Sequence, residues 1–172
     1  MDKKIVEQFV ESWGMMGTVW GISNSVARVH GLLIASDDPL SLVAIAETLK
    51  ISKGNASMCL KELRTWEVVR LVKTPGDRQD YYVSEEDAWK MFVSIAKERK
   101  RREFNTALNV LRHTMDEVGN KSDGVARKRI EGLTELLSTL DMVADRCLAD
   151  TQVARYALKL LSQFAKGRKP RI

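Results

Sequence analysis

The sequence contains few of the residues on which metal sites and catalysis most often depend. Among its 172 residues are two histidines and two cysteines. His30 and His113 stand at no metal-ligand spacing from Cys59 or Cys147. The chain also has no glycine run followed by Lys-Ser or Lys-Thr, the motif that cradles nucleotide phosphates. We therefore expect no metal, no cofactor and no enzymatic activity, and we expect His30 to be a packed side chain rather than a general base.

Long hydrophobic runs are missing as well. No apolar stretch approaches the roughly 20 residues of a membrane span. The N-terminal segment MDKKIVEQFVESWG lacks the apolar core of a secretory signal. These absences predict a cytoplasmic protein without a membrane partner. Cys59 and Cys147 both fall on predicted apolar helix stripes, so we expect buried thiols rather than a disulfide.

The region from residue 39 to residue 84 has the pattern of a helix, a tight turn, a second helix and a basic hairpin. Ser41 is expected to cap the first helix, whose apolar positions are Leu42, Ile45, Ala46 and Leu49. Ser52 is the expected N-cap of the second helix. The buried stripe of that second helix is predicted to be Ala56, Cys59, Leu60 and Leu63.

The other face of the second helix is predicted to be exposed and to carry short or polar groups. It comprises Gly54, Met58, Lys61 and Thr65, flanked by Ser57 and Glu62, with Ser52, Lys53 and Asn55 at the N-terminal end. Small side chains allow a helix to approach base edges closely, while its N-terminal amides face phosphate.

A β-hairpin is predicted to follow this helix. Its strands are expected at Val68–Lys73 and Asp80–Val83, with a turn at residues 74–77. Lys73, Arg78 and Gln79 would lie at or near the tip, where an arginine suits a phosphate or the minor groove. This order of elements is typical of a winged helix-turn-helix, although the same module also serves for protein docking.

The rest of the chain is predicted to be helical. Helices are expected at residues 3–13, 23–36 and 85–118, with the segment GMMGTVWGI between the first two. After a break at residues 119–124, one last helix carries an apolar seam with alternating steps of three and four residues. The seam comprises Ile130, Leu133, Leu137, Leu140, Ala144, Cys147, Thr151, Ala154, Leu158, Leu161 and Ala165. About five heptads of this kind predict a dimer interface, although a hairpin within one chain would use the same residues.

The first half of the chain closely resembles the GbsR-type branch of the MarR-like winged helix-turn-helix bacterial transcription regulators. The resemblance rests on four stretches, which are VARVHGLL, DPLSL, SKGNASM and PGDRQDYY. It implies a homodimeric regulator whose winged-helix heads stand on a helical platform. It also implies recognition contacts from Ser52, Lys53, Gly54, Asn55, Ser57 and Met58, and wing contacts from Asp77 and Arg78. In the family the wing acid orients the wing arginine. Met58 replaces an arginine common in the wider group, so no base specificity is carried over.

The same resemblance implies a small-molecule effector, since some members of this branch sense choline or related compounds through an aromatic cage. Trp13 and Trp20 are the candidate ligand-binding residues, because a quaternary ammonium binds well against such ring faces. Packing in the core is the simpler role for these rings, as only 6% of the residues are aromatic.

Together these observations predict a mainly α protein with a small β-wing, divided into three regions. We expect an N-terminal dimerisation arm at 1–21, a winged helix-turn-helix domain at 22–84 and a second dimerisation region at 85–172. The expected function is sequence-specific DNA binding by a homodimeric transcription regulator, most simply a repressor. The alternative is a winged-helix protein-interaction module. The candidate residues for binding double-stranded DNA are Ser52, Lys53, Gly54, Asn55, Ser57, Met58, Lys61, Lys73, Asp77, Arg78 and Gln79.

Overall fold

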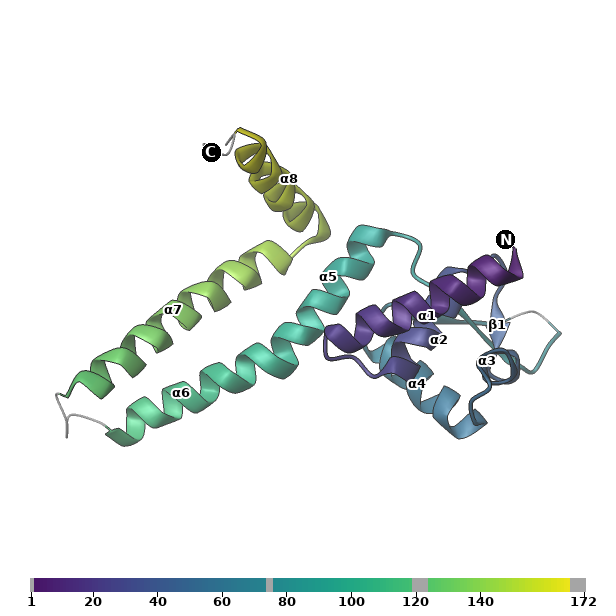
Figure 1. The fold of residues 1–172 in the computed structure, drawn as a ribbon, viewed down its shortest axis with the longest axis horizontal. Coiled ribbons are helices and arrows are strands. Elements are labelled where there is room, and N and C mark those ends of the chain that lie inside the picture. Colours follow the sequence, from purple (N-terminus) through teal and green to yellow (C-terminus); the bar gives the residue numbers. More distant parts are fainter. Residues whose placement is uncertain (1, 74–75, 119–123, 168–172) are drawn as a thin grey trace. The chain divides into compact units, whose positions relative to one another are not determined.

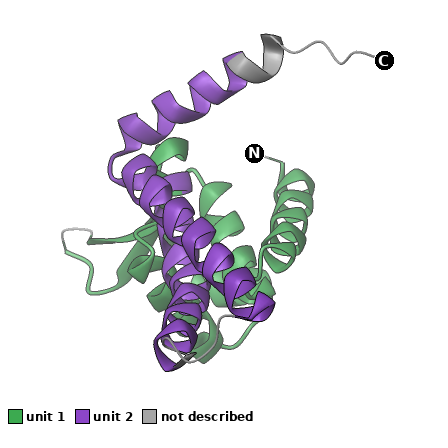
Figure 2. Cartoon of the chain, turned by 90° about the vertical axis from the view of Figure 1, so that its left-hand side faces the viewer, with its two compact units in different colours: residues 1–91 green, residues 92–172 purple. Residues whose placement is uncertain are grey.

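The computed structural model describes residues 2–73, 76–118 and 124–167. The chain forms two compact units, residues 1–91 and 92–172, coloured separately in Figure 2. The first unit contains α1 (Lys3–Val19), α2 (Asn24–Ile34), β1 (Leu40–Ser41), α3 (Leu42–Leu49), α4 (Lys53–Thr65), β2 (Val69–Lys73) and β3 (Asp80–Ser84) (Figure 1).

The helix-turn-helix forms where the sequence pattern predicts it. The Ser41 hydroxyl accepts a hydrogen bond from the Ala44 N–H at 3.2 Å and so caps α3. The Ser52 hydroxyl caps α4 in the same way, accepting from the Asn55 N–H at 3.1 Å. Between the two helices Lys50 adopts a left-handed conformation that reverses the chain. The predicted stripe of Ala56, Cys59, Leu60 and Leu63 is buried in the core.

The wing is an antiparallel sheet with the strand order β1-β3-β2. β2 pairs with β3 from Val69 opposite Ser84 to Lys73 opposite Asp80, which confirms the predicted hairpin. The third strand, β1, pairs Leu40 with Tyr82 and was not predicted. A strand of two residues is too short to show the alternation by which strands are recognised.

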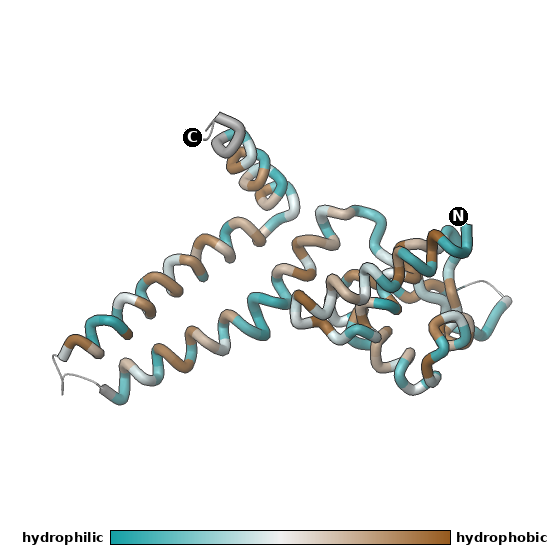
Figure 3. Tube along the Cα trace, viewed as in Figure 1, coloured by the Kyte–Doolittle hydropathy of each residue, from teal (hydrophilic) through white to brown (hydrophobic). Residues whose placement is uncertain are grey.

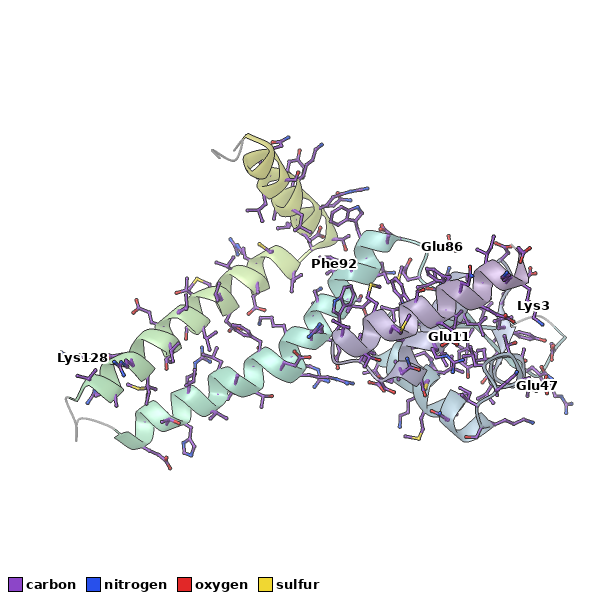
Figure 4. The ribbon with its side chains drawn as sticks, in the orientation of Figure 1. Lys3, Glu11, Glu47, Glu86, Phe92 and Lys128 are labelled. Atoms are coloured by element: carbon purple, nitrogen blue, oxygen red, sulfur yellow. The ribbon has the colours of Figure 1, made fainter. Side chains whose placement is uncertain are left out.

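α1 is longer than predicted, and its glycines explain the error. The helix continues to Val19, beyond the expected end at residue 13. Gly14 and Gly17 are buried where α1 packs on α2, and a methyl group added to Gly17 would collide with the Ala27 side chain. The glycines therefore allow two helices to approach closely rather than ending one of them. At the same contact Glu11, labelled in Figure 4, forms an ion pair with Arg28 of α2 at 2.7 Å.

His30 lies in the core of this unit, as its helical context predicted. It is 3% exposed, and its ring meets that of Trp13 edge-on at a centroid distance of 5.9 Å. Its Nε2 atom has no hydrogen-bond partner among the described residues. Burial lowers the pKa of His30 to about 4, so the side chain is neutral at physiological pH.

This buried histidine should make the first unit sensitive to acid. The unfolded chain takes up a proton near the ordinary histidine pKa of about 6.5, whereas the folded chain does so only near pH 4, so stability falls as the pH drops through this window. His30→Leu should reduce the loss of unfolding free energy between about pH 7 and pH 4.5 by about 2 kcal/mol. Urea unfolding followed by tryptophan fluorescence would measure it. His113→Gln, at an exposed position, is the control, and an equal loss in wild type and His30→Leu would contradict the prediction.

The second unit is built from long helices. α5 (Ala88–Arg99) continues through a π-helical turn, η1 (Lys100–Phe104), into α6 (Asn105–Val118), and α7 (Val125–Leu148) and α8 (Thr151–Gly167) follow. The predicted helix at 85–118 thus begins later, where Asp87 accepts a hydrogen bond from the Trp89 N–H at 2.8 Å. The predicted single last helix is wrong, since it breaks before Asp150. The Asp150 carboxylate accepts from the Gln152 N–H at 2.6 Å and starts α8.

The predicted apolar seam divides between two faces of α7, which packs beside α6. The less exposed face carries Ile130, Thr134, Leu137, Asp141, Ala144 and Leu148. A second stripe, Leu133, Leu136, Leu140 and Val143, is between 47% and 54% exposed. Hydrophobic and hydrophilic segments accordingly alternate along this helix (Figure 3). Cys147 is only half-buried, whereas Cys59 is fully buried, and both are free thiols.

Candidate nucleic-acid interface

The exposed face of α4 carries most of the predicted contact residues. Lys53, Gly54, Ser57 and Lys61 are exposed, and Met58 is 74% exposed. The exposed Met58 side chain is of a kind that suits contact with an apolar group such as a thymine methyl. Ser52 is also exposed, but its hydroxyl is engaged as the helix cap.

Asn55 differs from its neighbours, because its side chain is half-buried rather than exposed. Its Nδ2 donates to the Ser25 hydroxyl of α2 at 3.5 Å, and its Oδ1 accepts from the Cys59 thiol at 3.4 Å. These bonds tie the start of α4 to α2. Asn55 is therefore placed to orient the helix, and its contact with DNA stays a prediction.

Gly54 lies at a point of α4 where the described residues leave room for a side chain. A methyl group added there would meet nothing closer than the Ser52 hydroxyl at 3.9 Å, which is ordinary contact. Glycine destabilises a helix by roughly 0.5–1 kcal/mol relative to alanine. No packing contact among the described residues therefore requires glycine at this position.

Gly54→Ala should have opposite effects on the stability of the protein and on its affinity for DNA. We expect the unfolding free energy to rise by about 0.4–1 kcal/mol, because the helix gains propensity and the methyl group has room. The affinity for DNA should fall, because the added methyl group holds the helix away from it. Chemical unfolding and fluorescence anisotropy would measure the two quantities. Unchanged affinity in a stabilised variant would show that nothing approaches α4 at Gly54.

The wing presents a cation beside a well-fixed acid. Asp77, Arg78 and Gln79 are exposed, while residues 74 and 75 at the turn lie outside the described residues. The Asp77 carboxylate accepts hydrogen bonds from the Gln79 N–H at 2.9 Å and from the Tyr81 hydroxyl at 2.8 Å. These bonds lower the pKa of Asp77 and raise that of Tyr81. Lys73 forms an ion pair with Asp80 at 3.0 Å, so its charge is partly engaged within the hairpin.

The wing acid is fixed by groups of the wing itself. The Asp77 carboxylate holds the backbone of the turn and the Tyr81 ring, and the orientation of Arg78 by Asp77 stays a prediction. Tyr81 was not among the predicted site residues. Its signal in the sequence is a tyrosine four positions after Asp77 on the returning strand.

The two candidate ligand-binding tryptophans have different surroundings. Trp13 stacks on Phe9 at a centroid distance of 5.6 Å and meets His30 edge-on. Trp20 is 42% exposed at the end of α1. Trp13 thus makes packing contacts within the first unit, and ligand binding by the two rings stays a prediction.

The described residues form neither a metal-binding cluster nor a helix suited to a membrane. Within residues 2–73, 76–118 and 124–167, no group of three or more histidine, cysteine or acidic side chains is placed to hold a metal ion. In the same part of the chain, no helix combines the length and the apolar composition needed to cross a bilayer.

The helix-turn-helix followed by a three-stranded antiparallel wing is the winged-helix fold, a class that includes many DNA-binding proteins. A crystal structure of a transcriptional regulator shares this fold, with a TM-score of 0.65, 18% sequence identity and coverage of 89% of this chain and 98% of that one. No family model matches the sequence.

Two bacterial proteins are similar in sequence over part of their length. The chain is 26% identical over 95 residues to the putative HTH-type transcriptional regulator YvaV of Bacillus subtilis (strain 168), which covers 53% of this chain and 54% of that protein. It is 27% identical over 94 residues to the HTH-type transcriptional repressor OpcR of the same organism, covering 55% and 49%. The chain thus spans about half the length of the curated relatives it matches.

Proposed function

We propose that the protein is a DNA-binding transcription regulator of the MarR-like group. In this proposal α4 lies in the major groove and the wing lies beside it, over phosphate or the minor groove. The observation that carries the proposal is the exposed face of α4, where Gly54, Ser57, Met58 and Lys61 offer close approach, hydrogen bonding, an apolar contact and a positive charge. The names of both sequence relatives support the same function.

The branch of the family, the repressor role and the contact residues each have their own support. The GbsR-type branch is supported by the SKGNASM and PGDRQDYY stretches of the recognition helix and wing. A repressor role is supported by the description of OpcR as a repressor. The proposed contact residues remain the eleven predicted ones, of which Asn55 also positions α4 through its bonds to Ser25 and Cys59.

We further propose that the regulator is a homodimer joined through the second unit. The exposed stripe of Leu133, Leu136, Leu140 and Val143 on α7 supports this, as do the exposed apolar residues of α8. Contiguous exposed apolar surface of this kind is typical of protein interfaces. Two heads related by a two-fold axis would read two half-sites, which gives more specificity than one winged helix alone.

The function can be tested by the salt dependence of DNA binding. The wild-type protein should bind DNA containing the promoter of its own gene, and affinity should fall steeply as salt is added. Arg78→Ala should weaken binding to all sequences alike and reduce the slope of log affinity against log salt by about one unit. Arg70→Ala is a matched control, because Arg70 is engaged with Glu86 at 3.0 Å, at the end of β2 away from the turn.

The outcome also decides between the two functions that the sequence allowed. If the wild-type protein binds no DNA at low salt, the head is a protein-interaction module. If it binds DNA but Arg78→Ala changes neither affinity nor slope, the wing does not take part in binding.

A further inference from the structure

The hydroxyl group of Tyr81 holds the acid of the wing turn in one position. It donates to the Asp77 Oδ2 atom at 2.8 Å, while the Asp77 Oδ1 atom accepts the Gln79 N–H at 2.9 Å. Each carboxylate oxygen thus has a donor of its own, one from the returning strand and one from the backbone of the turn. The bond from Gln79 and the bond from Tyr81 both lower the pKa of Asp77, so its carboxyl group is ionised at neutral pH.

Tyr81 is itself held by the wing sheet. It lies in β3, the central strand, opposite Val72 of β2 and Ser41 of β1. Ser41 is the residue whose hydroxyl caps α3, so the strand that carries Tyr81 is paired directly with the start of the helix-turn-helix. The Tyr81 side chain is half-buried, and its hydroxyl reaches back four residues to Asp77. The bond therefore joins the sheet to the turn that extends beyond it.

The turn that Asp77 holds carries Arg78. This arginine is exposed, and it lies between the two residues that the bond from the Gln79 N–H to Asp77 connects. On the other side of Asp77, Gly76 has a φ of 85°, and a methyl group added there would meet nothing within 4 Å. Glycine gives the backbone wide conformational freedom, so the position of the turn depends on the side chains that restrain it.

We propose that Tyr81 is a positioning residue for DNA binding, which holds Asp77 so that the wing presents Arg78 to a phosphate or to the minor groove. The positioning role deepens the proposed function and rests on it, because it requires DNA beside the wing. A turn that is already fixed loses less conformational entropy when Arg78 binds. A carboxylate that is already bonded also competes less for the neighbouring guanidinium, which then remains available to an anion.

The bond can be tested without DNA. Tyr81→Phe removes only the hydroxyl group, so the ring can still pack on the sheet. The pKa of Asp77, followed by nuclear magnetic resonance, should rise towards its ordinary value, because one of the bonds that favour the ionised form is lost. Tyr82→Phe is the matched control, because Tyr82 is the next residue of the same strand and its side chain lies on the other face of the sheet. This control should leave the pKa of Asp77 unchanged.

The effect on DNA binding should depend on both Asp77 and Arg78. At low salt, Tyr81→Phe should weaken binding to the operator and to scrambled DNA alike by about fivefold, and Tyr82→Phe should weaken neither. In a protein that already carries Arg78→Ala, the further loss from Tyr81→Phe should be less than about twofold, because no guanidinium is left to position. The same should hold in a protein that carries Asp77→Ala, because the hydroxyl then has no carboxylate to hold. Fluorescence anisotropy would give the affinities, and melting temperatures would show that each variant is folded.

The outcomes distinguish the positioning role from the proposed function. A wild-type protein that binds no DNA would overturn both. If the wild-type protein binds DNA, three results would overturn the positioning role alone. The first is an affinity that Tyr81→Phe leaves unchanged. The second is a fivefold loss that persists in the Arg78→Ala protein, since Tyr81 would then act on binding without Arg78. The third is an Asp77 pKa that is the same in wild type and Tyr81→Phe, since the bond would then be absent in solution.

Discussion

Replacing Leu136 and Leu140 of α7 together by aspartate is expected to convert the protein into folded monomers. Both side chains are about half exposed in the single chain, at 54% and 47%, so the change should cost the monomer little. In the proposed dimer it would bury two charges in an apolar contact, which is strongly unfavourable. Sedimentation velocity at micromolar concentration would measure the change in mass.

The loss of the dimer should also weaken DNA binding. Two joined heads bind their half-sites as one unit, so separating them should reduce affinity for a two-fold symmetric site by at least about a hundredfold. Leu137→Asp is the informative comparison. Leu137 is on the less exposed face of α7, beside α6, so this change should unfold the second unit instead of releasing a folded monomer. A wild-type protein that sediments as a monomer would contradict the proposed dimer.

The head could be predicted closely from sequence because its signals are local. Ser41 and Ser52 are helix caps that precede periodic apolar residues by at most four positions, and both cap as expected. The turn between β2 and β3 is marked by a proline, a glycine and an aspartate in a row. Each of these features is decided by neighbours within a few residues, so no knowledge of distant contacts is needed.

Most of the errors occurred where a distant contact decides the structure, and one occurred where unbroken periodicity masked a local cap. Gly14 and Gly17 have the appearance of helix breakers until α2 is known to pack against them. The seam of α7 and α8 shows unbroken periodicity, yet Asp150 ends that regularity by capping a new helix. Periodicity also could not say which apolar residues face α6 and which remain exposed, because both sets share the same alternating steps.

In the candidate site, too, the features set by local sequence could be predicted, and those set by contacts with other elements could not. The exposed residues of α4 follow from helix geometry alone, and the structure exposes Lys53, Gly54, Ser57, Met58 and Lys61 as expected. The roles of Asn55 and Tyr81 depend on partners in other elements or across the turn.

Base reading by α4 should be visible as a loss confined to the specific site. Ser57 and Lys61 lie one turn apart on the exposed face, so a hydroxyl and an ammonium group can reach the same stretch of the major groove. Met58, which is 74% exposed, is placed for an apolar contact with a thymine methyl. We expect Ser57→Ala and Met58→Ala each to cost roughly 1–3 kcal/mol on the specific operator and little on random DNA.

A competition assay with the operator and a scrambled duplex of the same length, at one fixed salt concentration, would measure this difference. Thr65→Ala is the matched control, because Thr65 is exposed at the other end of the same helix and its hydroxyl is bonded to the Lys61 carbonyl at 3.0 Å. Lys61→Ala distinguishes a contact with guanine from a contact with phosphate. If Lys61 binds guanine, the variant should lose affinity only for the operator, and if it binds phosphate, the variant should lose affinity for both duplexes. Equal losses on both duplexes for Ser57→Ala and Met58→Ala would mean that α4 positions the protein on DNA without reading its sequence, and that specificity comes from the wing or from the shape of the DNA.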